Sequence, residues 1–168
     1  MFITDFENKR ISLSCINYPT FFIRHYQFMG QITTITSDLD KKDATFIVRR
    51  DLRTLSEDLF DTISLESVNY PGYYLTAKNG LIDLIRINDL DSQDSSGLYL
   101  KDMASFEVFE TELGIFSIGS PHEDWINDGE FYIRHQDYRL KFNKKDGTDL
   151  VEKDRRFKIE VPFWTENV

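Results

Sequence analysis

The stretch ISLSCINYP, at residues 11–19, decides the fold because the chain repeats it. It recurs as ISLESVNYP at residues 63–71, and a shorter version, FSIGSP, occupies residues 116–121. Each copy leads into an aromatic-rich segment, at residues 21–25, 73–77 and 131–135. Each then closes around a Phe in another alternating segment, at residues 44–48, 104–109 and 155–159. Self-similarity at a fixed period indicates a repeat architecture, here three copies of about fifty residues.

The residues within each copy alternate in polarity as they do in β-strands. Ile11, Leu13 and Cys15 are apolar, whereas Ser12 and Ser14 between them are polar, which is the period of a strand. Three dipeptides typical of tight hairpin turns separate the runs: Asn79-Gly80, Asp128-Gly129 and Asp146-Gly147. A helical pattern is confined to a linker at residues 54–60.

Three copies of about four short strands, closed on themselves, predict an all-β protein with the β-trefoil fold. We expect one domain over residues 1–168, with lobes at about 11–50, 63–109 and 114–159. The core is predicted at bulky apolar residues that recur at equivalent repeat positions. These are Phe22, Ile23, Phe46, Leu75, Phe106, Ile133 and Phe157.

Charge and hydropathy exclude several classes of partner. The chain has 20 Lys and Arg against 29 Asp and Glu, a net charge of -9, which disfavours nucleic acids and anionic membranes. No stretch approaches the roughly 18 consecutive apolar residues of a membrane span. Charged residues at positions 5, 7, 9 and 10 do not suit a secretory signal. The chain as it stands is therefore expected in the cytoplasm, or outside the cell if it is excised from a larger precursor.

Few residues suggest catalysis or metal binding. Cys15 is the single cysteine, which excludes an internal disulfide and a zinc site with several thiolates, and its alternating strand predicts that it packs in the core. The three histidines are scattered, and no GxSxG, HExxH, P-loop or GxGxxG motif occurs. We predict no enzymatic activity, no metal site and no cofactor.

The ordered motifs resemble a known family. They are SxxNYP at residues 14–19, an aromatic-rich strand ending in Arg24-His25, and KDATF at residues 42–46. This succession is similar to the arabinofuranose-binding β-trefoil domain of α-L-arabinofuranosidase B, carbohydrate-binding module family 42. The resemblance extends from about Ile11 to Ile159. It implies a non-catalytic, lectin-like module for arabinofuranose side chains of plant-type polysaccharides, with a glycoside hydrolase catalytic domain as a possible companion.

The resemblance also implies which residues bind the sugar. In that family each lobe supplies the His of the Arg-His step and the Asp ahead of the closing Phe. The first copy has His25 and Asp43, and the third copy has His135 and Asp154. Such a carboxylate would accept hydrogen bonds from two neighbouring sugar hydroxyls, and Tyr26 would add a hydroxyl or a ring. All these groups are expected at a solvated rim, where their removal would barely change stability.

The second copy departs from this pattern. Ala77 stands at the His position and Met103 at the Asp position, with Asp102 displaced by one residue. In a strand a displacement of one residue reverses the side that a group faces. The second lobe is therefore predicted not to bind sugar. Arg24 and Arg134 are expected to pair with acidic neighbours and anchor their strands.

A second hypothesis comes from a different class of protein. The unpaired Cys15 and the absence of a signal sequence favour a cytosolic β-trefoil scaffold that binds other proteins, with fascin-like or cytokine-like architecture and no sugar binding. The paired His and Asp positions favour the carbohydrate-binding module instead.

Overall fold

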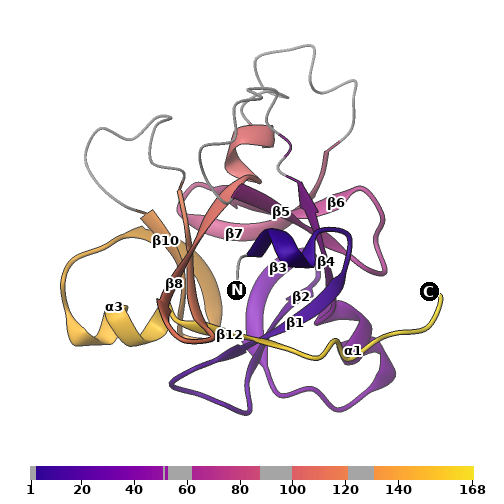
Figure 1. Cartoon of the computed structure of the whole chain (residues 1–168), viewed down its shortest axis with the longest axis horizontal. Helices are drawn as coiled ribbons and strands as arrows, with labels where there is room; N and C mark the ends of the chain where they lie inside the picture. Colours follow the sequence, from indigo (N-terminus) through magenta and orange to yellow (C-terminus); the bar gives the residue numbers. More distant parts are fainter. Residues whose placement is uncertain (1–2, 51, 53–61, 88–99, 121–130) are drawn as a thin grey trace.

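The computed structural model describes residues 3–50, 52, 62–87, 100–120 and 131–168 (Figure 1). These residues form mostly strands with a few short helical segments, so the prediction of an all-β fold is confirmed. The first six strands are β1 (Arg10–Cys15), β2 (Phe22–Tyr26), β3 (Met29–Thr33), β4 (Phe46–Arg50), β5 (Thr62–Ser67) and β6 (Tyr73–Lys78). The other six described strands are β7 (Leu81–Arg86), β8 (Phe106–Glu112), β9 (Ile115–Gly119), β10 (Phe131–Gln136), β11 (Arg139–Lys144) and β12 (Phe157–Glu160). Short helical segments are η1 (Ile3–Phe6), α1 (Asp38–Asp43) and α3 (Asp149–Asp154), and residues 100–103 are also helical. No helix in these ranges has the length and apolar character needed to span a membrane.

Six of the strands close into a ring. β1 pairs with β4 on one side and with β12 on the other, and the circle continues from β12 to β9, β8, β5 and back to β4. All of these pairings are antiparallel. Each sequence copy contributes its first and last strand to the ring, because the alternating ISLSC-type segment and the segment around the closing Phe are both ring strands.

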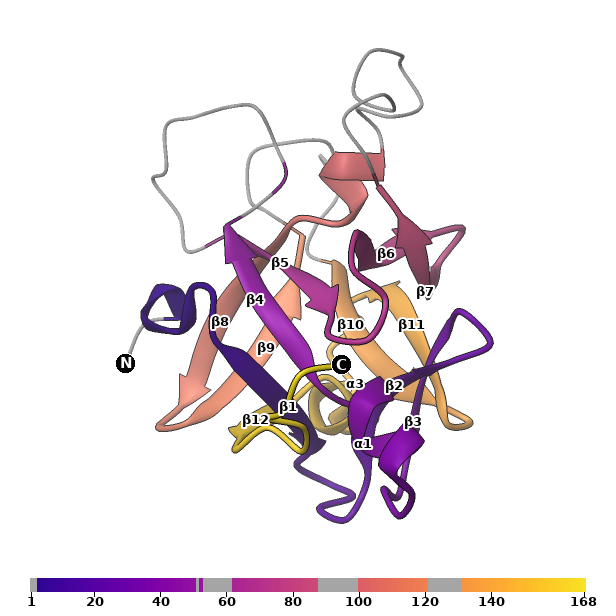
Figure 2. The ribbon, with the colours of Figure 1, turned by 90° about the vertical axis from the view of Figure 1, so that its right-hand side faces the viewer.

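The remaining strands form three hairpins, β2–β3, β6–β7 and β10–β11. The second strands of these hairpins pair with one another, β3 with β7, β11 with β3 and β11 with β7. Figure 2 shows the hairpins gathered on one side of the molecule and the ring strands β1, β8, β9 and β12 on the other. Each copy therefore gives two strands to the ring and one hairpin to its end.

The turn predictions have mixed outcomes. Asn79-Gly80 forms the predicted tight turn of β6–β7, with both residues in the left-handed region. Asp146-Gly147 does not make a hairpin, since it precedes α3, where the Asp146 carboxylate accepts hydrogen bonds from the backbone and side chain of Thr148. Asp128-Gly129 and the helical pattern at 54–60 lie outside the described residues.

Six of the seven predicted core residues are at most 1% exposed, and they occupy matching positions in the three copies. Phe46, Phe106 and Phe157 begin the last strand of each copy, and Ile23, Leu75 and Ile133 lie in the hairpins. Burying one such side chain contributes on the order of 1.5–3 kcal/mol. Phe22 was wrongly assigned to the core: it is half-buried because it faces away from its neighbour Ile23, and its ring packs edge-on against Phe163 at 4.6 Å.

Cys15 is buried in the core, as its alternating strand predicts. Burial, with a smaller contribution from the charge of Asp154, raises the pKa of its thiol to about 12. The thiolate that a nucleophile requires is therefore not populated near neutral pH.

Candidate functional site

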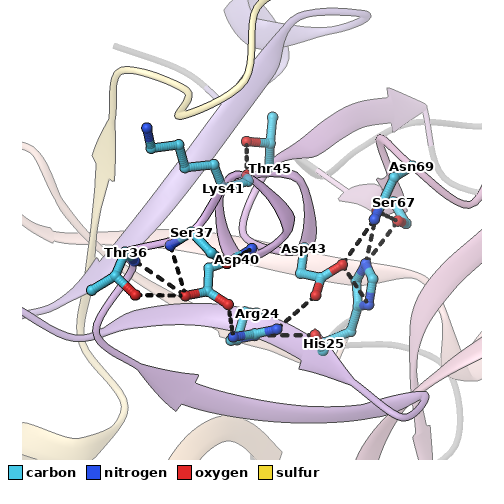
Figure 3. Close-up of polar contacts among 10 residues, drawn as sticks. All are labelled: Arg24, His25, Thr36, Ser37, Asp40, Lys41, Asp43, Thr45, Ser67 and Asn69. Carbon is cyan, nitrogen blue, oxygen red and sulfur yellow. Dashed lines mark hydrogen bonds and ion pairs between the residues drawn. The ribbon is translucent and has the colours of Figure 1, made fainter. Parts of the chain in front are cut away.

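The two residues predicted from the first copy come together. His25 lies on β2 and Asp43 is the last residue of α1, and the imidazole Nδ1 is 3.6 Å from the carboxylate Oδ1 (Figure 3). A capping box at Ser37 starts α1, and the backbone N–H groups of Thr36 and Ser37 donate to the Asp40 carboxylate. The helix is thereby fixed at its start, and Asp43 is held at its end, directly over β2.

An arginine locks the Asp43 carboxylate. Arg24 donates from Nη2 to Asp43 Oδ2 at 2.6 Å and from Nη1 to Asp40 Oδ1 at 2.7 Å. The side chains of Arg24 and Asp43 are each 7% exposed. The prediction that Arg24 pairs with acidic neighbours is confirmed, and one of these neighbours is the candidate sugar-binding residue itself.

The second copy supplies the third member of the site. Asn69, from the NYP motif of that copy, donates from Nδ2 to Asp43 Oδ1 at 2.8 Å. Its Oδ1 lies 3.0 Å from His25 Nε2, which also lies 2.9 Å from the Ser67 hydroxyl. An amide oxygen only accepts, so Nε2 donates to Asn69 in the tautomer that has its hydrogen on this nitrogen. Asn69 therefore bridges His25 and Asp43, which makes the site a junction between two copies.

The same NYP motif places a ring on the imidazole. Tyr70 contacts His25 edge-to-face, with ring centroids 5.5 Å apart, and is 40% exposed. Phe28 and Tyr73 pack on Tyr70 at 5.4 and 5.7 Å. Tyr26, the predicted aromatic residue, lies beside the Arg24 guanidinium at 5.6 Å instead. Its role in binding stays a prediction.

The third copy builds the same arrangement with the first. His135 Nε2 is 2.8 Å from Asn17 Oδ1, and Asn17 Nδ2 donates to Asp154 Oδ1 at 2.9 Å. Arg134 donates to Asp154 Oδ2 at 2.5 Å, which confirms the predicted pairing of this arginine. Tyr18 contacts the His135 ring edge-to-face at 5.3 Å. The first and last copies of the chain thus meet at this second site.

A cavity of about 300 Å³ opens beside His135 and Asp154. Its walls combine polar groups with apolar ones, a mixture typical of small-ligand sites. The remaining lining residues are Tyr18, Gln136, Asp137, Tyr138 and Leu150. Gln136 is the third-copy equivalent of Tyr26, because each residue directly follows the histidine of its copy. The position equivalent to Tyr26 therefore borders the cavity in the third copy.

The second copy has neither the imidazole nor the carboxylate. Ala77 and Met103 stand at their positions and are 1% and 8% exposed. We expected Asp102 to lie in a strand and to face away from the site. The strand is wrong, because residues 100–103 are helical, like the ends of α1 and α3. The displacement still matters in a helix, where successive side chains point about 100° apart.

The expectation of a solvated rim is also wrong. His25 and His135 are each 3% exposed, and Asp43 and Asp154 are 5% and 4% exposed. Ring strands, short helices and the neighbouring NYP motif enclose these groups from several sides. Only the tertiary arrangement brings these elements together, so the position of the residues in the sequence did not reveal their burial.

Burial also sets the charge state of the imidazoles. It lowers the pKa of His25, against the opposing charge of Asp43. It likewise lowers the pKa of His135, where Asp154 opposes the shift and Arg134 adds to it. The rings are thus neutral at pH 7, and a neutral imidazole has one donor and one acceptor nitrogen.

The sequence interpretation missed Asn17, Asn69, Tyr18 and Tyr70, which were treated as strand ends. A signal for them was present. The NYP motif occurs in copies one and two, whereas the His and Asp pair occurs in copies one and three. In a closed ring, each His and Asp pair meets the NYP motif of the next copy: copy one meets copy two, and copy three meets copy one. The second copy, which lacks the pair, is followed by the third copy, which lacks NYP.

Among the described residues, no cluster of three or more His, Cys, Asp or Glu side chains could hold a metal ion. The carboxylates of Asp43 and Asp154 are each engaged by one arginine and one asparagine, which fixes their orientation. A fixed carboxylate beside a neutral imidazole and a ring can accept hydrogen bonds from hydroxyl groups and cover an apolar face.

Residues 4–48 match the family model described as the alpha-L-arabinofuranosidase B (ABFB) domain. This match confirms the family resemblance over the first copy and supports a carbohydrate-binding role in general. No curated protein matches the sequence significantly.

Solved structures share the fold over most of the chain. A crystal structure of an arabinofuranosidase complexed with arabinofuranosyl-alpha-1,2-xylobiose superposes with a TM-score of 0.72 and 21% identity, over 94% of this chain and 32% of that one. The Polyporus squamosus lectin, bound to a human-type influenza-binding epitope, gives 0.58 and 10% over 91% and 49% of the two chains. The designed 3-fold symmetric protein ThreeFoil gives 0.55 and 8% over 89% and 96%. The chain thus spans about a third of the arabinofuranosidase that it resembles.

Proposed function

We propose that the chain is a single β-trefoil domain, with lobes at about 11–50, 63–109 and 114–159, that binds arabinofuranose side chains of plant-type polysaccharides without acting on them. The closed ring of six strands with three hairpins at its end supports the trefoil. The observation that carries the function is the repeated site: the same His, Asn, Asp and Tyr groups meet at two junctions between copies.

The geometry suits a small neutral sugar. In each site the carboxylate keeps lone pairs beyond those that the arginine and asparagine use, and these can accept from two adjacent hydroxyls. The neutral imidazole adds a hydrogen-bonding group, and Tyr18 or Tyr70 can cover an apolar sugar face. The cavity beside His135 and Asp154 provides the space for the ligand.

We further propose that a glycoside hydrolase catalytic domain is the module's partner. Support comes from the family match and from an arabinofuranosidase of which this chain corresponds to about a third. The candidate carboxylates do not suit catalysis themselves, because Asp43 and Asp154 belong to different sites, and each is tied to an arginine. A glycosidase needs two carboxyl groups that flank one bond.

Affinity gel electrophoresis with arabinoxylan, and with unsubstituted xylan as the reference, tests the proposal. Arabinoxylan should retard the protein with dissociation constants of about 0.1 to 1 mM per site, or about −5.5 to −4 kcal/mol. Two sites on one domain should increase the apparent affinity for a branched polymer.

Variants connect the retardation to the two sites. D43N combined with D154N should abolish it, whereas D102N, in the lobe without the histidine, should leave it unchanged. Equal retardation of the wild-type protein and the D43N/D154N variant would overturn the proposal. No retardation by any arabinose-bearing glycan would favour the protein-binding scaffold instead.

A further inference from the structure

The three hairpin tips share one backbone conformation but not one sequence. Each turn has two residues between paired strand ends, and both residues have positive φ. The second residue is Phe28 at 62°, Gly80 at 75° and Tyr138 at 63°. This type of turn strongly favours Asn-Gly, which only the second copy has.

Phe28 and Tyr138 adopt a conformation that disfavours large side chains. A bulky residue with positive φ is an outlier, and such strain persists where the surroundings hold it in place. Rings of the neighbouring copy do so here, since Phe28 packs on Tyr70 and Tyr138 stacks on Phe21 at 5.6 Å. The fold itself does not need these rings, because Gly80 forms the same turn without one.

The two rings are exposed despite these contacts. Phe28 is 47% exposed and Tyr138 is 58% exposed, so each presents an aromatic surface to solvent. They occur in the two lobes that supply a His and Asp pair, and glycine stands at this position in the lobe without that pair. A strained aromatic residue is thus found only where a copy has the His and Asp pair, although all three hairpins have the same turn.

Each ring is also continuous with its site. Tyr138 lines the cavity that contains His135 and Asp154. Phe28 contacts Tyr70, which in turn contacts His25. The ring at the hairpin tip, Phe28 or Tyr138, therefore lies next to a ligand bound against the histidine. The rest of a larger glycan would pass over this ring.

We propose that Phe28 and Tyr138 form a second subsite at each of the two sites, which stacks against the sugar to which the bound arabinofuranose is attached. This inference rests on the proposed function and adds its ligand class, a branched neutral oligosaccharide instead of a free terminal sugar. The flat apolar face of a pyranose suits an exposed aromatic ring. The net charge of -9 on the chain favours a neutral main chain over one that carries uronic acids.

Two probes separate the two subsites in isothermal titration calorimetry. Methyl α-L-arabinofuranoside reports on the pocket, and arabinofuranosyl-α-1,2-xylobiose reports on the pocket and the tip together. The test variant is F28G combined with Y138G, because glycine accepts the positive φ at both turns. L113A is the matched control, since Leu113 is an apolar residue, 93% exposed, in the turn between β8 and β9.

The wild-type protein should bind the trisaccharide more tightly than the methyl glycoside. F28G/Y138G should lose about fivefold in affinity for the trisaccharide, the size of one aromatic contact, and less than about twofold for the methyl glycoside. F28L/Y138L, which keeps apolar side chains but removes the rings, should show the same split. L113A should bind both probes as the wild-type protein does.

Four results would overturn the inference. An equal loss of affinity for both probes would show that the rings contact the arabinofuranose alone. No loss for either probe would show that the rings take no part in binding. If both probes bind the wild-type protein equally, the second subsite is absent while the proposed function stands. If neither probe binds the wild-type protein, the proposed function fails and this inference fails with it.

Discussion

The side-chain amide of Asn69 donates to the carboxylate of Asp43 across the boundary between the second and first copies, over 2.8 Å. Asn17 and Asp154 repeat the bond across the boundary between the first and third copies, over 2.9 Å. Because the ring of strands is closed, the first and third copies meet at the second of these sites. Neither site is contained within one copy.

This relationship predicts that N69A weakens binding at the first site, although Asn69 belongs to the copy without a binding pair. Loss of the amide frees the Asp43 carboxylate and the His25 ring to move, and we expect about a tenfold loss of affinity there. Calorimetry with methyl α-L-arabinofuranoside should then detect one site in place of two. N167A, at an exposed asparagine near the carboxyl end, is the control. Two intact sites in N69A would show that the first site does not need the junction.

Burial of the Arg24–Asp43 pair predicts a large stability cost for D43A, against the small one expected from sequence. Arg24 Nη2 and Asp43 Oδ2 are 2.6 Å apart, and each side chain is 7% exposed. Loss of the carboxylate therefore leaves the buried Arg24 charge with the more exposed Asp40 as its remaining carboxylate partner. We expect the free energy of unfolding to fall by about 3–5 kcal/mol, measured by urea denaturation. D38A is the control: the Asp38 side chain is 79% exposed and its pairing with Lys41 should contribute less than about 1 kcal/mol. Similar losses in the two variants would contradict the buried pairing.

The lowered pKa values of His25 and His135 predict that stability decreases in mild acid. The unfolded chain takes up protons near pH 6.5, whereas the native state resists protonation until a lower pH. The unfolded state therefore binds more protons in this window, and the free energy of unfolding falls as pH drops below about 6.5, by up to about 1.4 kcal/mol per pH unit for each histidine. Urea denaturation at pH 7.5 and pH 5.5 measures the change. H25Q combined with H135Q should flatten it, and an unchanged slope would exclude these histidines as its cause.

The burial of Cys15 predicts a thiol that does not react in the native state. Its side chain is 1% exposed and its pKa is raised to about 12, so the thiolate is scarce and shielded. A thiol-specific disulfide reagent at pH 8 should modify the protein only in denaturant. Cys15 is the sole cysteine in the chain, so the signal needs no further assignment. Rapid modification of the native protein would contradict the packing of β1.

The sequence alone determined the three copies, their strands and the positions of most core residues. Ile23, Leu75 and Ile133, or Phe46, Phe106 and Phe157, recur at matching places because each copy must bury the same faces. The Arg-His step and the Asp before the closing Phe were also visible, together with their loss at Ala77 and Met103. These features follow from local periodicity and spacing, which a linear pattern records.

The tertiary structure decided which copies share a site, and therefore which residues complete it. Closure of the ring places Asn69 on Asp43 and Asn17 on Asp154, contacts that span 26 and 137 positions in the chain. It also buries the histidines and carboxylates, because strands from one copy and turns from the next enclose them. The hairpin tips depend on the tertiary structure in the same way. Only the backbone torsions and the neighbouring rings show that Phe28 and Tyr138 are held in a strained conformation beside the two sites. Contacts between distant segments depend on chain closure, and closure has no local pattern in the sequence.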